Sequence, residues 1–575
     1  MTRHPFTALC FAATTATLLL TACTTDDTSV QETLHPGAKP DETAAYSSDP
    51  FSIPVRLTSQ AMEKLSRDSS ADSGTLLASH FQPDLTTRFS HEQYEAPDDN
   101  KVKQTDNESV STFSIDVDTG SYSNIRRFLQ QGSLPPADAV RVEEMLNYFS
   151  YDYPAEATVE QPFSLVTELG TTPWNAQTKL LHIGLKGFVP PHTDSMAANL
   201  VFLVDVSGSM NSPNKLGLLK SSIGMLANDL DERDTVSIVV YAGSSGVVLP
   251  PTAGSRRAAI YNALLRLQAG GSTNGAGGIQ LAYKLAAKNF IKGGVNRVIL
   301  ATDGDFNVGI SDTEALKKLI SQKRESGIAL TTLGFGTGNY NDHLMEQLAN
   351  TGNGTYAYID TLAEARKVLV DERYSTMMRI AGDVKIQVEF NPQRISEYRL
   401  IGYTNRLLTR EQFNNDEVDA GDIGAGHTVT ALYEVALRGE GGEQIPALRY
   451  KQPGSSHTAE YNDELAEIRL RYKLPGEQQS RLISEAVHDR LLVEQAGQPS
   501  ANFRFSASVA ALGQLLRSYP PMDAFDYQDV RDLAKNSTGD DEYGYRAEFV
   551  RLVDMAESLD RMQRAANGIA LQEEG

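Results

Sequence analysis

Between residues 199 and about 373, short runs of consecutive apolar residues alternate with longer stretches in which apolar residues recur at helical spacing. The runs are NLVFLVDV, TVSIVVYA, NRVILAT and IALTTLGFG. Continuous apolar runs are typical of strands that are buried on both faces, as in parallel sheets covered by helices on two sides. The pattern therefore predicts a doubly wound α/β domain with a mostly parallel sheet.

Strand patterns also occur on both sides of this unit. Residues 162–170 and 179–187 alternate apolar and polar side chains and predict two paired strands. After residue 376 the pattern returns in DVKIQVEFN, EYRLIGYT, HTVTALYEVALR and ELAEIRLRYKL, and helical spacing follows from about residue 502. We therefore expect the α/β unit to be inserted into a β-rich domain formed by both flanks, with a helical segment at the C-terminus.

These changes of pattern divide the chain of 575 residues into six segments. They are a signal peptide (1–22), an acidic tether (23–107), an N-terminal α+β region (108–195), the α/β domain (196–375), a β-rich domain (376–480) and a helical C-terminal region (481–575). The tether is rich in Ser, Thr, Asp, Glu and Pro and has few apolar residues, which is typical of a disordered linker.

The N-terminus has the pattern of a lipoprotein signal. Arg3 precedes an apolar stretch from Phe6 to Leu20, and small residues then lead to Cys23 in Leu-Thr-Ala-Cys. The stretch is shorter than the ~20 apolar residues of a membrane span, and it resembles a lipobox, which implies that Cys23 carries lipid. We expect a lipid-anchored envelope protein. Thr24 after the cysteine favours the outer membrane by resemblance to enterobacterial sorting, and it leaves the periplasmic face and the cell surface as alternatives.

Charge and cysteine content agree with this assignment. Cys10 would leave with the signal peptide and Cys23 would be acylated, so the mature chain would hold no thiol for a disulfide. The net charge is -22, and the loss of Arg3 makes it -23 (-22 minus 1). Such a chain is repelled by nucleic acid and by anionic headgroups, so membrane attachment is assigned to the lipid.

The residues that carry chemistry follow the first buried strand, as Asp205-Val206-Ser207-Gly208-Ser209. Ligands bind beyond the carboxyl ends of strands in open α/β sheets, and two hydroxyls on one tight turn can face a small hard cation with Asp205 behind them. Thr273 and Asp303 come from two other loops at the same predicted edge. An all-oxygen set of this kind suits Mg²⁺, with Mn²⁺ or Ca²⁺ as possible substitutes.

With these five positions in order, residues 199–373 resemble the von Willebrand factor A family and its metal-ion-dependent adhesion site. The resemblance implies that Ser207, Ser209 and Thr273 bind the ion directly. It also implies that Asp205 and Asp303 act through bound water, and that an acidic residue of a protein partner completes the shell. The flanking segments SIDVDTGSYSNIRRFL and MLNYFSYDYP resemble one group of bacterial lipoproteins with this domain and an uncharacterised C-terminal family domain. A membrane-anchored protein-binding module, in adhesion or in envelope-complex assembly, is the function that this resemblance implies.

Two other functions remain as alternatives. One is an envelope scaffold that does not use metal. The other is an aspartic-type hydrolase, because Asp118-Thr119-Gly120-Ser121 resembles the catalytic turn of pepsin-like proteases, which need a second carboxylate. No second such turn follows, so the structural interpretation is a strand end and a turn that caps the next helix, with Asp116 and Asp118 as an open alternative for a weak cation site. No nucleophile elbow, Walker loop or H-E-x-x-H pair is present in the sequence, and we expect no enzymatic activity.

Overall fold

The computed structural model describes residues 92–94, 98–155, 157–191, 196–272, 275–304, 313–446, 461–491, 499–522 and 524–573. The predicted signal peptide, Cys23, most of the predicted tether and Thr273 lie outside these residues. Within the part of the chain that the structure describes, no helix combines the length and apolar character that crossing a membrane requires.

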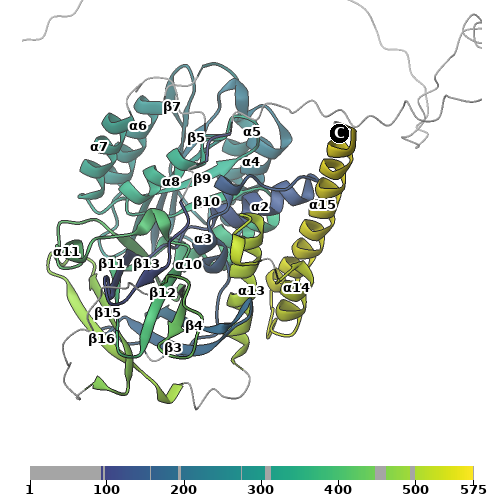
Figure 1. Cartoon of the computed structure of the whole chain (residues 1–575). Coiled ribbons are helices and arrows are strands. Elements are labelled where there is room, and N and C mark those ends of the chain that lie inside the picture. The colour runs from purple at the N-terminus through teal and green to yellow at the C-terminus, as the bar shows by residue number, and fades with distance from the viewer. Residues whose placement is uncertain are drawn as a thin grey trace, which may run out of the picture. The chain divides into compact units, whose positions relative to one another are not determined.

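Six strands form the sheet of the α/β domain, in the order β10-β9-β8-β5-β6-β7 (Figure 1). Their bounds are β5 Ala198–Asp205, β6 Thr235–Tyr241, β7 Ser245–Ala253, β8 Val295–Thr302, β9 Ala329–Phe335 and β10 Tyr356–Ile359. All neighbours are parallel except β6 and β7, which are antiparallel. The predicted mostly parallel sheet is confirmed. Strand β7 is not predicted by the sequence pattern, and its two prolines are tolerated because β7 is an edge strand.

Helices cover both faces of this sheet. Their bounds are α4 Leu218–Asp229, α5 Arg257–Arg266, α6 Gly275–Lys288, α7 Thr313–Arg324, α8 Asp342–Thr351 and α9 Leu362–Arg366. In β5, Phe202 packs in the core formed with α4, α5 and α9, whereas its neighbour Leu203 packs in the core formed with α6, α7 and α8. Successive side chains of a strand point to opposite faces, so burial on both faces explains the unbroken apolar run.

The start of α4 is irregular. Ser212 and Pro213 have the residue types of an N-cap and first turn, but Pro213–Gly217 forms a short π-helical segment and the α-helix begins at Leu218. The Ser212 hydroxyl donates to Asn214 Oδ1 at 2.6 Å instead of accepting a backbone N–H. The wide π turn buries two successive side chains, Lys215 and Leu216.

The flanks form two antiparallel sheets with one shared core. The first sheet has the order β1-β12-β14-β4-β3, and the second has the order β13-β11-β15-β16, with β2 also paired to β11. The bounds are β1 Lys103–Gln104, β2 Val110–Ser114, β3 Phe163–Thr172, β4 Asn175–Gly187, β11 Arg379–Phe390, β12 Ile395–Ile401, β13 Gly421–Gly424, β14 Thr428–Leu437, β15 Glu464–Lys473 and β16 Arg481–His488. Strand β4 precedes the α/β domain and pairs with β14, which follows it. The predicted insertion is therefore confirmed.

Helices cover the outer side of the first sheet. They are α2 Gly120–Gln130, α3 Val142–Asn147, α13 Ala501–Leu516, α14 Tyr527–Lys535 and α15 Tyr545–Glu573. Leu180, Ile401 and Leu432 of that sheet share one core with them, and in Figure 1 α13, α14 and α15 lie together beside this part of the fold. Two boundaries differ from the prediction. The region expected to be helical from residue 481 begins with strand β16, and residues 103–104, expected in the tether, form β1 and pair with β12.

Candidate functional site

Strand β5 places the Asp-x-Ser-x-Ser turn at the edge of the sheet where the strand ends. Ser207 Oγ and Ser209 Oγ lie 2.9 Å apart. Ser207 is buried and Ser209 is exposed, so the pair of hydroxyls reaches the surface. Gly208 donates its N–H to the carbonyl of Gly271 at 3.1 Å, which ties the turn to the chain just before Thr273.

Asp205 lies behind the two hydroxyls and is fully buried. One carboxylate oxygen accepts the backbone N–H of Ser207 at 2.8 Å, and the other accepts the hydroxyls of Thr302 at 2.9 Å and Tyr241 at 3.3 Å. Burial raises the pKa of Asp205, although the bonds from Ser207 and Thr302 oppose that change. Asp205 is therefore held by the fold as a buried acceptor beside the turn.

Asp303 follows β8 at the same edge of the sheet and is also buried. Its Oδ2 lies 2.9 Å from the ammonium nitrogen of Lys215, which comes from the π-helical segment just after the serine turn. Lys215 also donates to Asn339 Oδ1 at 3.3 Å. Lys215 is not among the residues predicted from the sequence, because a lysine beside an apolar helical stripe is ordinarily a solvated residue.

These residues fit a small, oxygen-binding cation. Two cis ligands of an octahedral Mg²⁺, each at 2.0–2.1 Å from the ion, lie about 2.9 Å apart. The two serine oxygens, which are hydrogen-bonded to each other in the structure, have a separation compatible with this geometry. The structure brings Asp205, Ser207, Ser209 and Asp303 to one edge of the sheet. The position of the fifth predicted residue, Thr273, lies outside the described residues.

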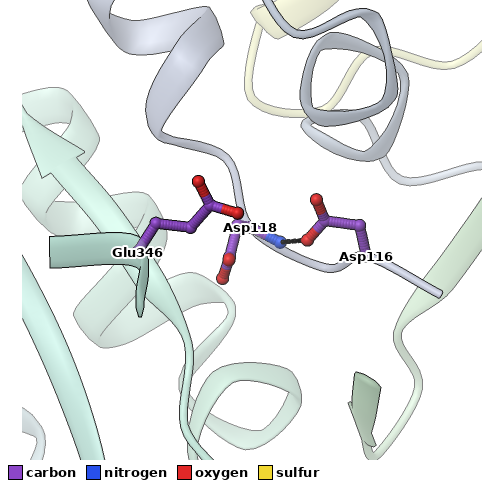
Figure 2. A group of neighbouring side chains, drawn as sticks. All are labelled: Asp116, Asp118 and Glu346. Carbon is purple, nitrogen blue, oxygen red and sulfur yellow. Dashed lines mark hydrogen bonds between the residues drawn. The ribbon is translucent and has the colours of Figure 1, made fainter. Parts of the chain in front are cut away.

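A second group of acidic side chains lies elsewhere, where the N-terminal region meets α8. Asp116, Asp118 and Glu346 are buried (Figure 2). One carboxylate oxygen of each residue lies within 4.8 Å of the other two, close enough that the three could hold a metal ion. Asp116 and Asp118 come from the segment after β2, and Asp116 accepts the backbone N–H of Asp118 at 3.0 Å. The sequence indicated the two aspartates, whereas Glu346 enters only through the tertiary fold.

The guanidinium of Arg406 already lies among these three carboxylates. It bonds to both oxygens of Asp116 at 3.1 and 3.2 Å, to Asp118 at 3.1 Å and to Glu346 at 3.0 Å. Burial raises the pKa of Asp118 well above its ordinary value, and the charge of Asp116 raises it further while Arg406 lowers it. Burial also raises the pKa of Glu346. In this structure, then, the cation that bonds to all three carboxylates is an arginine that follows β12.

Asp118, the residue of the hydrolase alternative, makes its contacts within the fold. Its carboxylate is buried, accepts the backbone N–H of Tyr356 on edge strand β10 at 2.7 Å and bonds to Arg406. These contacts join the N-terminal region to the edge of the α/β sheet. A helix does follow the turn, as expected, but α2 already begins at Gly120, and its N-cap, Thr119, makes no side-chain capping bond. The N–H of Ser121 is instead accepted by Glu144 at 2.7 Å.

Comparison with protein families divides the chain into three matched parts. Residues 88–182 match the model described as von Willebrand factor, and residues 199–371 match the von Willebrand factor type A domain. Residues 375–559 match the model described as the C-terminal part of uncharacterized protein YfbK.

Comparison of the chain with whole proteins agrees with these family matches. The chain is 46% identical over 473 residues to the uncharacterized protein YfbK of Escherichia coli, and the match covers 81% of each chain. It is 25% identical to the uncharacterized protein sll0103 of Synechocystis, over 58% of this chain and 75% of that one. Among solved structures, a von Willebrand factor type A protein from Catenulispora acidiphila matches with 17% identity and a TM-score of 0.38, over 66% of this chain and 87% of that one.

Proposed function

Because the chain belongs to the family of YfbK-like proteins, with a von Willebrand factor type A domain between an N-terminal region and the YfbK C-terminal domain, we propose that it is a protein-binding module that uses a metal ion. Ser207, Ser209 and Thr273 would bind Mg²⁺, or Mn²⁺ or Ca²⁺ in its place, and Asp205 and Asp303 would support it from behind. An acidic residue of the partner would complete the shell. The observation that carries the proposal is the pair of serine hydroxyls 2.9 Å apart in front of a buried aspartate.

The ion supplies positive charge at a surface where few anionic groups touch it, so that it attracts a carboxylate. The protein supplies the geometry of the hydroxyls, through the bond of Ser207 to Asp205 and the bond of Gly208 to Gly271. Adhesion and the assembly of an envelope complex both fit this chemistry. We propose that the protein acts by binding and has no enzymatic activity.

We expect Ser209→Ala to weaken Mg²⁺ binding at least ~10-fold, because it removes one of two adjacent ligands. The measurement is titration calorimetry of the purified full chain with MgCl₂. Ser221→Ala is the matched control, because Ser221 lies on the exposed side of α4 and bonds only to the Gly217 carbonyl among described contacts. Equal affinity in both variants would remove the serine turn from the metal site.

Partner recognition is tested with the same variants. The full chain is immobilised and exposed to a detergent extract of the native envelope, with Mg²⁺ or with EDTA. Retention of a protein by the wild type and by Ser221→Ala with Mg²⁺, and its loss with EDTA or Ser209→Ala, is the expected result. Equal retention in all samples would favour a scaffold that does not depend on metal. The Lys215–Asp303 ion pair at the site is the observation that supports this alternative.

We also propose that Cys23 is acylated and anchors the protein in the envelope, with the outer membrane as the expected destination. The support is the sequence Leu-Thr-Ala-Cys after an apolar stretch. Replacing Cys23 with serine should move the protein from the membrane pellet to the soluble fraction and abolish labelling by radioactive palmitate. Unchanged sedimentation of Cys23→Ser would show that the attachment does not depend on this cysteine.

A further inference from the structure

One buried cation lies at the edge of the sheet beside the serine turn. Lys215 is only 7% exposed, and its ammonium lies 2.9 Å from Asp303 Oδ2. Buried lysines are rare unless they are paired. Asp303 is the residue that the proposed site uses as its second carboxylate, so Lys215 and a metal ion would share one anionic group.

The fold makes a specific place for this side chain. The π-helical turn Pro213–Gly217 directs Lys215 inward, and π turns occur often at functional sites. Gly336, at φ +76°, leaves the space that the lysine stem fills. A Cβ at Gly336 would lie 2.3 Å from Lys215 Cγ and Cε. Any side chain at Gly336, in the loop after β9, would therefore exclude Lys215 from its place beside Asp303.

The loop that carries Asn339, the second partner of Lys215, is held from its other side by residues 92–94. Glu92 accepts the N–H of Gly338 at 2.9 Å and pairs with Arg127 of α2 at 2.9 Å. Gln93 donates its N–H to the carbonyl of Tyr340 at 2.8 Å. The ammonium is therefore held between Asp303 and a loop that is itself tied to the N-terminal region.

The charge of the site follows from these contacts. Asp205 and Asp303 alone would offer a divalent ion two negative charges. The positive charge of Lys215 offsets one of them. Like charges repel strongly in partly buried surroundings, where the effective dielectric constant is about 20 instead of 80. The pair thus reduces the attraction of the site for a metal ion and leaves the bound ion with more net positive charge for a partner's carboxylate.

We propose that Lys215 is an internal counter-cation that sets the metal affinity of the serine turn, through its ion pair with Asp303. This inference rests on the proposed metal site. It assigns the control of metal affinity to a residue outside the predicted ligand set. The weak binding that results makes occupancy respond to the concentration of Mg²⁺ around the protein, because a site with a higher dissociation constant fills over a higher range of concentration.

The test changes the charge at residue 215 while preserving a hydrogen-bond donor. Lys215→Gln can still donate to Asp303, so it does not leave that buried carboxylate without a partner. Lys323→Gln is the matched control, because Lys323 is an exposed residue near the end of α7. Mg²⁺ affinity of the full chain is measured by titration calorimetry, and circular dichroism without added metal verifies that each variant is folded.

Lys215→Gln is expected to bind Mg²⁺ about tenfold more tightly than the wild type, and Lys323→Gln to bind as the wild type does. Equal affinity in all three proteins would overturn the role of Lys215 and leave the metal site standing. Absence of Mg²⁺ binding in all three would overturn the metal site and this inference together. If Lys215→Gln is unfolded without metal, Gly336→Ala, whose Cβ would take the place of the lysine stem and move the ammonium away from Asp303, should raise affinity by about twofold or more, and an unchanged value would again overturn the inference.

Discussion

Replacing Arg406 with methionine should lower the free energy of unfolding by about 3–5 kcal/mol. The guanidinium bonds to Asp116, Asp118 and Glu346, all of which are buried. The methionine would leave three carboxylates facing one another in a region of low dielectric constant. Urea denaturation followed by circular dichroism at pH 7 measures the loss.

A matched control separates this effect from the loss of any arginine. Arg438 pairs with Asp106 at 2.8 Å, but both side chains are about 40% exposed (41% and 38%). Arg438→Met should cost less than ~1 kcal/mol, as exposed pairs do. Asp118→Asn in the Arg406→Met background should recover part of the loss, because it removes one charge and keeps an acceptor for the Tyr356 N–H. A loss below ~1 kcal/mol for Arg406→Met would show that the cluster is neutralised by other means.

The same variant tests the cluster as a cation site. With Arg406 absent, Asp116 and Asp118 would lose the guanidinium that bonds to them and Glu346 would keep, among the described residues, only Arg141, at 4.0 Å, so a divalent ion could take the place of Arg406. Millimolar Ca²⁺ or Mg²⁺ that restores the stability of Arg406→Met, with no effect on the wild type at this cluster, would show that the three carboxylates bind metal only when the arginine is removed. Because the serine turn also binds metal in our proposal, this measurement is made in the Ser209→Ala background.

Acidification from pH 7 to pH 4 should remove ~3 kcal/mol of stability through His182 alone. His182 is 1% exposed on β4, and its Nε2 lies 2.9 Å from the hydroxyl of Tyr153. Burial lowers the pKa of His182 from 6.5 to about 4. Between these two values the unfolded chain binds a proton that the folded protein does not, so stability falls as the pH falls through this window.

The contribution of His182 is isolated by His182→Gln, which keeps a neutral polar group for Tyr153. Its urea midpoint should fall less than that of the wild type between pH 7 and pH 4, by an amount equivalent to ~3 kcal/mol. His488→Gln, a change at a partly exposed histidine of β16, should retain the full acid sensitivity, because His182 is still present. Parallel acid losses in the wild type and His182→Gln would contradict the assignment.

Local patterns predicted the buried strands of the α/β domain because each is apolar on both faces, and they predicted α2, α13 and α14 because apolar residues recur at helical spacing. The strands that were not predicted have sequences that do not differ clearly from those of loops and turns. Strand β10 is only four residues long, β7 carries two prolines, and β13 lies in a Gly- and Asp-rich stretch. Each of them is stabilised by pairing with a neighbouring strand, β10 with β9, β7 with β6 and β13 with β11.

The candidate site divides in the same way. Asp205, Ser207 and Ser209 lie within five residues, so their chemistry could be recognised locally, and Asp303 could be added because parallel strands end at one edge of the sheet. The sequence by itself therefore determined the fold class, the insertion of the α/β domain and the turn that faces the proposed ion. The tertiary structure alone decided which charges neutralise these groups. Lys215 meets Asp303 across 88 positions, and Arg406 meets Asp116 across 290. The energy of a charge depends on its burial and on the nearest opposite charge, and both are properties of the folded chain, not of neighbours in sequence.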